Sequence, residues 1–228
     1  MGFEKINDTT YVCDEGHVRF YLLIGDKEAL LIDSGMQTRN AKELAEEITD
    51  KNIRLFNTHA DRDHIGSNAQ FDQVMINPAE LVNYGPEHSS QEIIAIYDGD
   101  IIDIGNRPLK AIALPGHTPG STALLDLNSG RLFSGDPIQR NGRNFMFGLM
   151  RNLAAYIKSL ERLLTLNEDI KEIYPCHGTF PVRMDVVPEL IEGAKRVEKG
   201  EIPAVMTEFF GKSVAEYDIG GNTLLCDT

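Results

Sequence analysis

The chain has 228 residues and a formal net charge of −13, from 35 acidic and 22 basic side chains. Hydrophobic residues make up 42% of it, which is ordinary for a folded domain and too high for a disordered one. The acidic balance repels phosphate backbones and no apolar run is long enough to span a bilayer, so we expect neither a nucleic-acid partner nor a membrane partner. We expect a single domain over residues 1–228.

Short strands dominate the first third of the chain, where apolar runs are bounded by Gly and Asp turn signals. One helix interrupts them, because apolar residues from Ala41 to Ile48 recur at the spacing of a single helix face. The last of these strands runs directly into His59. The predicted strands lie at 11–13, 18–24, 29–32 and 54–58.

The rest of the chain alternates between predicted strands and two longer helices. One helix spans Leu153–Leu164 with Asn152 as its N-cap, and another spans 186–199 and stops at Gly200. The tail is predicted to be an extended pair around Gly220. This order predicts two sheets packed face to face with helices on the outside. The further predicted strands lie at 111–114, 123–127, 132–133 and 173–174.

The three cysteines, Cys13, Cys176 and Cys226, are too few and too scattered for a disulfide framework. With an N-terminus that lacks a basic start followed by an apolar stretch, they predict a cytoplasmic protein. Cys176 stands next to a histidine, where it can be a redox-sensitive thiol or a buried, inert one. The inert thiol is favoured.

Histidines and aspartates gather where several predicted strands end. So many polar side chains cannot all point into an apolar core, because each must be paired or bound to something. Neutral imidazoles and carboxylates suit Zn, Fe or Mn, and their number exceeds one tetrahedral site, so we expect two divalent metal ions. The candidate metal ligands are His59, Asp61, Asp63, His64, His117, Asp136 and His177.

At these residues the chain resembles the metallo-β-lactamase fold superfamily. The resemblance covers nearly the whole chain, from the turn at Asp33-Ser34-Gly35 to the histidine before Gly178. It implies an α/β (α+β) fold, a four-layer αββα sandwich with the metals in a shallow cleft at one edge of the two sheets. By the family pattern His59 and His117 bind the first metal, Asp63, His64 and His177 bind the second, and Asp136 bridges both.

The same resemblance implies a dinuclear metal-dependent hydrolase. Such an enzyme cleaves an ester, thioester, lactone or related bond of a small-molecule substrate, with a metal-bridging hydroxide as nucleophile. Asp63 is the candidate catalytic residue, since the matching aspartate orients this hydroxide in many members. Zn is the expected metal, with Fe or Mn as alternatives, and homo-oligomerisation is left open. His17 and His88 match nothing in the pattern and are expected at the surface.

Asp61 departs from the commoner His-x-His-x-Asp-His pattern, because it takes the place of the second histidine. An ionised Asp61 adds negative charge, which makes a poorer Lewis acid and favours Fe or Mn relative to Zn. It can bind a metal directly or make only an outer hydrogen bond. The departure opens an alternative, an iron-dependent oxidoreductase that is flavodiiron-like or persulfide-dioxygenase-like. In the latter case His59, His117 and Asp136 hold one iron. A non-catalytic binding or sensing module is the third alternative.

Residues beyond the bridging aspartate are candidates for contact with substrate. Arg140, Arg143 and Arg151 form a basic island, and we expect Arg140 and Arg143 to bind an anionic substrate unless they are solvated surface arginines. The apolar residues 145–147 can line the cleft or form a small core cluster, which is favoured. The aromatic pair at 209–210 can cover the cleft or form a dimer contact.

Overall fold

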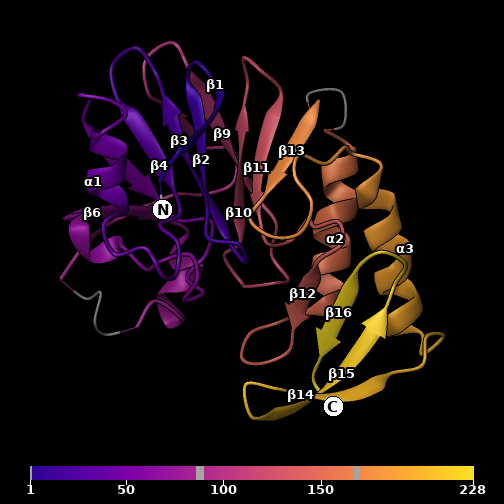
Figure 1. Ribbon diagram of the computed structural model, residues 1–228. Coiled ribbons are helices and arrows are strands. Elements are labelled where there is room, and N and C mark those ends of the chain that lie inside the picture. The colour runs from indigo at the N-terminus through magenta and orange to yellow at the C-terminus, as the bar shows by residue number, and fades with distance from the viewer. Residues whose placement is uncertain (1, 86–89, 167–169) are drawn as a thin grey trace.

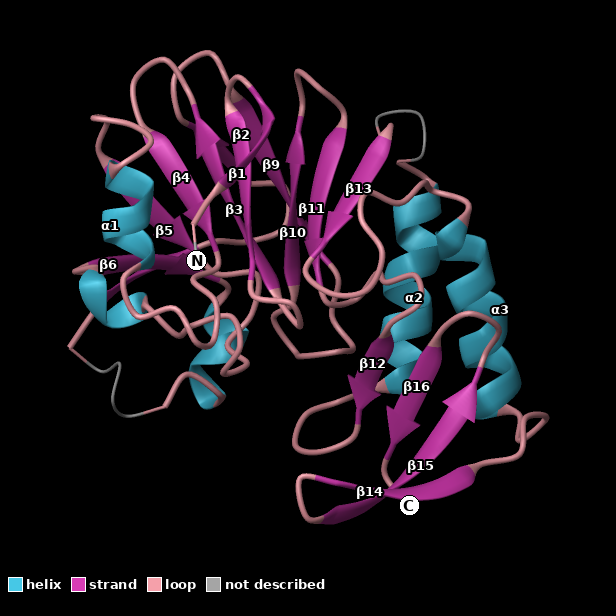
Figure 2. Cartoon of the chain, in the orientation of Figure 1, coloured by secondary structure: helices cyan, strands magenta, loops and turns pink. Residues whose placement is uncertain are grey.

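The computed structural model describes residues 2–85, 90–166 and 170–228, so His88 lies outside the described residues. Two sheets pack face to face with helices on both outer faces (Figure 1). Helix α1 (Ala41–Glu46) covers one side, and α2 (Leu153–Leu164) and α3 (Val186–Glu198) cover the other (Figure 2). The predicted four-layer αββα sandwich is confirmed.

The first sheet has seven strands that follow one another in sequence order. Its first four strands pair antiparallel, and from β4 onward the pairs are parallel. The strands are β1 (Glu4–Asn7), β2 (Thr10–Asp14), β3 (Arg19–Ile24), β4 (Ala29–Ile32), β5 (Ile53–Phe56), β6 (Gln73–Ile76) and β7 (Glu92–Ala95).

The second sheet has five strands in the order β13-β11-β10-β9-β8. Strands β8 to β11 are antiparallel, and β13 joins the edge of the sheet parallel to β11. The strands are β8 (Ile101–Asp103), β9 (Pro108–Ala113), β10 (Thr122–Asp126), β11 (Arg131–Gly135) and β13 (Glu172–Pro175).

Successive residues of the central strands fill different cores, because side chains alternate across a strand. In β3, Phe20 and Leu22 pack on the side of α1, whereas Tyr21 and Leu23 pack between the two sheets. The Tyr21 and Phe133 rings meet there edge to face, with centroids 5.2 Å apart. The sandwich therefore has a core between the sheets and a further core under the helices on each side.

The two long helices follow the sequence prediction closely. The Asn152 side chain accepts a hydrogen bond from Ala155 N–H at 2.8 Å, which confirms it as the N-cap of α2. Tyr156, Leu160 and other apolar residues of α2 pack on the second sheet. Among the described helices, none combines the length and the apolar character that crossing a bilayer requires.

A third, smaller sheet lies beside the ends of α2 and α3, in the order β12-β16-β15-β14 (Figure 1). The predicted extended pair around Gly220 is confirmed as its β15–β16 hairpin. The sheet as a whole was not predicted, because β12 pairs parallel with β16, which lies far along the chain. The strands are β12 (Arg143–Met146), β14 (Val205–Phe209), β15 (Lys212–Asp218) and β16 (Thr223–Cys226).

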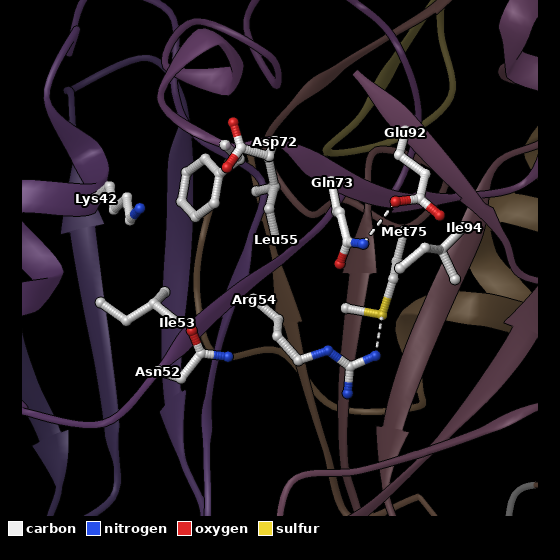
Figure 3. Close-up of a pocket in the computed structure, with 11 residues that line it drawn as sticks. Lys42, Asn52, Ile53, Arg54, Leu55, Asp72, Gln73, Met75, Glu92 and Ile94 are labelled. Atoms are coloured by element: carbon white, nitrogen blue, oxygen red, sulfur yellow. Dashed lines mark hydrogen bonds between the residues drawn. The ribbon is translucent and has the colours of Figure 1, made fainter.

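A hollow of about 300 Å³ opens in the first sheet between β5 and β6. These strands pair only at Phe56 and Met75, so they diverge away from that point. Figure 3 shows the side chains that line the gap, Arg54, Gln73 and Glu92 among them. None of the seven predicted metal ligands lines it, so we attribute it to incomplete strand pairing.

Candidate metal centre

The predicted ligands stand just beyond the ends of strands from both sheets. The cluster that begins at His59 follows β5, His117 lies between β9 and β10, Asp136 follows β11, and His177 follows β13. Loops beyond strand ends hold functional side chains while the strands keep the core intact. All seven predicted ligands meet at this edge of the sandwich.

One group of ligand atoms consists of His59, Asp61 and His117. Asp61 Oδ2 lies 3.6 Å from Nε2 of His59 and 3.3 Å from Nε2 of His117. Asp136 Oδ2 faces the same group, at 3.4 Å from Nε2 of His117 and 4.0 Å from Nε2 of His59. Two imidazole nitrogens and two carboxylates thus surround one point.

A second group consists of Asp63, His64 and His177. Asp63 Oδ2 lies 3.6 Å from Nε2 of His64 and 3.2 Å from Nε2 of His177. Asp136 Oδ1 lies 3.2 Å from each of these two nitrogens. Asp136 therefore directs one carboxylate oxygen to each group, which is the geometry of a bridging ligand.

Several of these atoms are buried without a hydrogen bond. Nε2 of His59, His64 and His117, together with Oδ1 of Asp136, have no hydrogen-bond partner among the described residues. Buried polar atoms in proteins are otherwise almost always hydrogen-bonded. A set of imidazole nitrogens and carboxylate oxygens matches what Zn, Fe and Mn prefer, so the residues present fit two divalent metal ions.

Asp33 is fully buried and fixes the imidazoles behind the ligand atoms. Its carboxylate accepts hydrogen bonds from Nδ1 of His64 and from N–H and Oγ1 of Thr58, each at 2.8 Å. Since Thr58 donates its hydroxyl proton to Asp33, it accepts from Nδ1 of His59 at 3.0 Å. Both histidines are therefore left with a free Nε2. Cys176 is buried nearby, and burial raises its pKa to about 12, as expected of an inert thiol.

The other two histidines are oriented by backbone carbonyls. Nδ1 of His117 donates to the carbonyl oxygen of Phe145 at 2.9 Å, with the side-chain oxygen of Asn144 at 3.1 Å. Nδ1 of His177 donates to the carbonyl oxygen of His17. A hydrogen bond at Nδ1 fixes the tautomer and aims Nε2, as in known metal sites. His17 thus contributes its backbone, which no sequence motif indicates.

Two glycines directly before ligands allow close approaches. Gly116 has a φ of 139°, and a Cβ there would overlap the backbone of Tyr156 in α2. Gly135 has a φ of 61°, and a Cβ there would lie 2.8 Å from Oγ1 of Thr58. A larger residue at position 116 would displace the loop of His117 from α2. A larger residue at position 135 would displace the end of β11 from Thr58, which follows β5.

The charges of the centre depend on each other. Burial lowers the pKa of His177, but the carboxylates of Asp136 and Asp63 outweigh it and raise this pKa to about 10. The pKa of His64 is also raised, because Asp136, Asp63 and Asp33 outweigh its burial. Protons on these histidines balance the carboxylates when no cation is bound, and a divalent cation takes their place.

Arg151 is a member of the cluster that sequence reasoning did not place there. Its Nη2 lies 2.9 and 2.7 Å from the two carboxylate oxygens of Asp61. Its Nη1 donates to the carbonyl oxygen of His117. The guanidinium supplies one positive charge next to the carboxylate that departs from the family pattern. The extra negative charge expected from Asp61 is therefore compensated within the protein.

The other two arginines of the basic island turn away from the ligands. Arg140 pairs with Asp185 at 3.3 Å and Glu189 at 3.2 Å, at the start of α3. Arg143 pairs with Glu216 of β15 at 3.3 Å and its side chain is 54% exposed. Of the three arginines, Arg151 alone contacts a predicted ligand.

Glu80 is a buried residue of the centre's framework that the sequence did not indicate. It lies in the short 3₁₀ helix η2 (Pro78–Val82) and is fully buried. Its carboxylate accepts hydrogen bonds from the backbone N–H groups of Ala60 at 2.9 Å and Gly120 at 2.6 Å. It therefore ties the loop of His59 to the loop of His117. A single Glu among uncharged residues is usually at the surface, so no pattern indicated it.

Among the ligands, the centre is open to solvent at three side chains. The side chains of Asp61, Asp63 and His177 are 20%, 25% and 19% exposed, whereas His59 and His117 are fully buried. Among its ligands, the centre is therefore accessible to solvent at Asp61, Asp63 and His177.

The chain was compared with known proteins. The family model of the metallo-beta-lactamase superfamily matches residues 13–177. Acyl-coenzyme A thioesterase MBLAC2 of Homo sapiens is 24% identical over 204 residues, which cover 70% of this chain and 73% of that protein. The mitochondrial persulfide dioxygenase ETHE1 of Bos taurus is 28% identical over 174 residues, 73% of this chain and 66% of that protein.

A solved structure, a metallo-beta-lactamase from Pontibacter korlensis, matches with a TM-score of 0.68 at 16% identity. The match covers 85% of this chain and 98% of that one, and at this identity it shows the fold. The family model covers well over half of the chain. The chain belongs to the metallo-beta-lactamase superfamily.

Proposed function

We propose that the protein is a dinuclear metal-dependent hydrolase of a small acyl compound, an ester, thioester, lactone or related substrate. The observation that carries this proposal is the pair of ligand groups on either side of Asp136, whose two oxygens each face one group. A relative of this chain is an acyl-coenzyme A thioesterase, which supports a thioester as the first substrate to try.

In this proposal His59, Asp61 and His117 hold one metal and Asp63, His64 and His177 hold the other, with Asp136 shared. Two divalent cations supply Lewis acidity that polarises a carbonyl and lowers the pKa of water toward neutrality. Zn is the expected metal. The chain's own contribution is a largely buried set of ligands whose histidines are already oriented by hydrogen bonds at Nδ1.

Asp63 is the proposed catalytic carboxylate. It is the most exposed of the three ligands at the opening, so it can touch both a water molecule and a substrate. Burial raises its pKa, but His64 and His177 outweigh this and hold the pKa well below its usual value. It is therefore ionised at neutral pH and able to accept a hydrogen bond that orients the attacking water.

Arg151 keeps the centre suited to hydrolysis in this proposal. Asp61 replaces a neutral histidine with an anion, which would weaken the Lewis acidity of the centre. The guanidinium within 2.9 Å of both Asp61 oxygens offsets that charge and restricts the carboxylate to one orientation. The anionic-substrate role suggested for Arg140 and Arg143 forms no part of the proposal, since both are paired with carboxylates.

An iron-dependent oxidoreductase is the second candidate, and a persulfide dioxygenase is among the relatives. One iron on His59, His117 and Asp136 would use only part of the cluster. It would leave the second group, Asp63, His64 and His177, without a function. Compared with such a single-iron centre, the dinuclear hydrolase accounts for both groups, and it is preferred.

The test is to purify the protein anaerobically without added metal, measure its metals, and assay it separately after loading with Zn or Fe. We expect two Zn ions per chain and turnover of thioesters or esters that does not depend on oxygen. The variant Asp63→Asn removes a proposed ligand together with the proposed catalytic carboxylate, so it should bind the metal of its group more weakly and lose most of the turnover. One Fe per chain with oxygen consumption on a persulfide would overturn the proposal. Metal-loaded protein that turns over neither substrate class would do the same.

A further inference from the structure

An aromatic cluster joins the segment after Asp136 to the tail of the chain. Phe145 and Phe147, in and just after β12, meet Phe209 at the end of β14, with ring centroids 4.9 and 6.1 Å from it. Phe210 stacks edge to face on Phe209 at 4.5 Å. The tip of the β14–β15 hairpin therefore folds back against the segment that leaves β12 (Figure 1).

Phe210 of this cluster and two residues of the adjoining segment are exposed, whereas the other three rings are half-buried. Phe210 is 81% exposed, Leu149 is 72% and Met150 is 50% exposed. Residues 144–150 contain no charged side chain. Large apolar side chains are thus exposed both on this segment and on the hairpin tip that meets it at Phe145, and exposed apolar patches often mark binding sites.

The apolar segment is attached to the metal centre at both ends. At one end the carbonyl oxygen of Phe145 accepts a hydrogen bond from Nδ1 of His117 at 2.9 Å. At the other end Arg151 contacts both carboxylate oxygens of Asp61. Leu149 and Met150 lie between these two attachments. Met150 directly precedes Arg151, so the exposed residues of this segment stand beside the part of the centre where Asp61 is partly exposed.

We propose that Phe147, Leu149, Met150 and Phe210 form a binding surface for the unbranched apolar chain of an acyl substrate. The proposal rests on the proposed hydrolysis of an acyl compound at the adjacent centre. A second copy of the chain is a less suitable occupant, because a protein covering this surface would also obstruct the opening beside Asp61. An alkyl chain leaves room for its own carbonyl group to reach the metals.

The test is a calorimetric titration of the Zn-loaded protein with straight-chain carboxylates from butanoate to decanoate, which gives a Kd for each chain length. We expect the Kd to fall about threefold for each added methylene, since each one buries apolar surface. The variants Phe210→Ser and Leu149→Ser should fold normally, because both side chains are exposed, and should lose most of this dependence on chain length. The matched control is Leu127→Ser, an exposed leucine at the other end of β10, which should behave like the parent.

A Kd independent of chain length, or an unchanged dependence in both variants, would overturn the inference. So would sedimentation that shows a dimer in the parent and monomers in the variants while the chain-length dependence stays the same. Chain-length-dependent binding without hydrolysis of any ester or thioester would contradict the proposed function and leave this inference standing. Hydrolysis of esters or thioesters with a Kd that does not depend on chain length would support the proposed function and overturn this inference.

Discussion

At the scale of single residues, Asp61 faces two histidines of the candidate metal centre and the guanidinium group of Arg151. Oδ2 of Asp61 lies within 3.6 Å of two histidine Nε2 atoms and 2.7 Å from Nη2 of Arg151. Both side chains of the pair are mostly buried, at 20% and 13% exposed. Removing one partner of such a pair leaves an uncompensated charge in a poorly hydrated place. The effects of replacing Asp61 and of replacing Arg151 on the free energy of unfolding should therefore depend on each other.

A double-mutant cycle tests this dependence. Asp61→Asn and Arg151→Met should each lower the free energy of unfolding of the metal-free protein by about 2 kcal/mol, because each strands a charge. The double variant should lose clearly less than the sum of the two. Urea denaturation in the presence of a chelator gives the free energy of unfolding of the parent, the two single variants and the double variant. Strictly additive losses would show that the two side chains do not depend on each other.

At the scale of elements, buried carboxylates hold loops that lie beyond the strand ends, including two that carry predicted ligands. Glu80 joins the loops of His59 and His117, and Glu15 of the β2–β3 turn accepts N–H groups from residues 36–38. Strand pairing cannot fix these loops, since they lie beyond the strand ends. Hydrogen bonds from backbone N–H groups to an ionised carboxylate are stronger than neutral ones.

Glu80→Gln should destabilise the protein by about 2 kcal/mol, because the amide can accept fewer hydrogen bonds and turns an N–H toward a backbone N–H. It should also weaken metal binding by about tenfold through looser ligand loops. The control Glu46→Gln changes an exposed glutamate of α1 and should alter neither quantity. Unfolding in urea and competition with a metal-binding dye measure the two effects. Equal stability of both variants would contradict this role of Glu80.

Glu15 predicts a dependence of stability on pH. Burial raises the pKa of Glu15, but N–H donation from Gln37, Thr38 and Met36 outweighs it and places the pKa below its usual 4.5. A lower pKa in the folded state means that Glu15 stabilises the fold above pH 4.5 and that this stabilisation is lost as pH falls below that value.

Glu15→Gln should therefore reduce stability at neutral pH by about 1 kcal/mol and have a smaller effect in acid. The measurement is the difference in unfolding free energy between parent and variant, at neutral pH and again well below the usual glutamate pKa, in metal-free protein. A difference that stays constant across this range would show that the Glu15 charge does not contribute.

The main elements of the sandwich could be predicted from the sequence, whereas the third sheet could not. The helix at Leu153–Leu164 has a regular apolar face and a capping asparagine, and both signals are local. Strand β12, at Arg143–Met146, pairs with β16, so the contact that makes it a strand lies far away in sequence. Local patterns carry no information about such a pairing.

The candidate site also contains residues that local sequence patterns indicate and residues that they do not. His59, His117 and Asp136 stand in motifs with recognisable neighbours, so they could be proposed as ligands. Arg151 contacts Asp61 across 90 residues, and nothing near either residue predicts the pair. Arg140 has the same local appearance as Arg151, yet it pairs with acidic residues of α3. Which arginine reaches the ligands is decided by tertiary structure.

At the scale of the whole molecule, the centre is the place where two sheets meet. β5 of the first sheet and β9, β11 and β13 of the second bring their ends together there. Asp136 follows β11 and contributes one oxygen to each ligand group. The backbone N–H of Thr122 also donates to the carbonyl of Thr58, at 2.9 Å, across the two sheets beside it. Correct packing of the sheets and metal binding should therefore depend on each other.

A cytoplasmic location and a small-molecule substrate stay predictions.

The metal content of Asp136→Ala tests the central idea most directly. The parent and the variants Asp136→Ala and His117→Ala are equilibrated with the same free Zn concentration, and bound metal per chain is measured by elemental analysis. If Asp136 serves both groups, the parent holds two ions, Asp136→Ala loses both, and His117→Ala keeps the ion of the other group. An Asp136→Ala protein that still binds two ions would contradict a shared carboxylate, and a parent that binds only one would contradict a dinuclear centre.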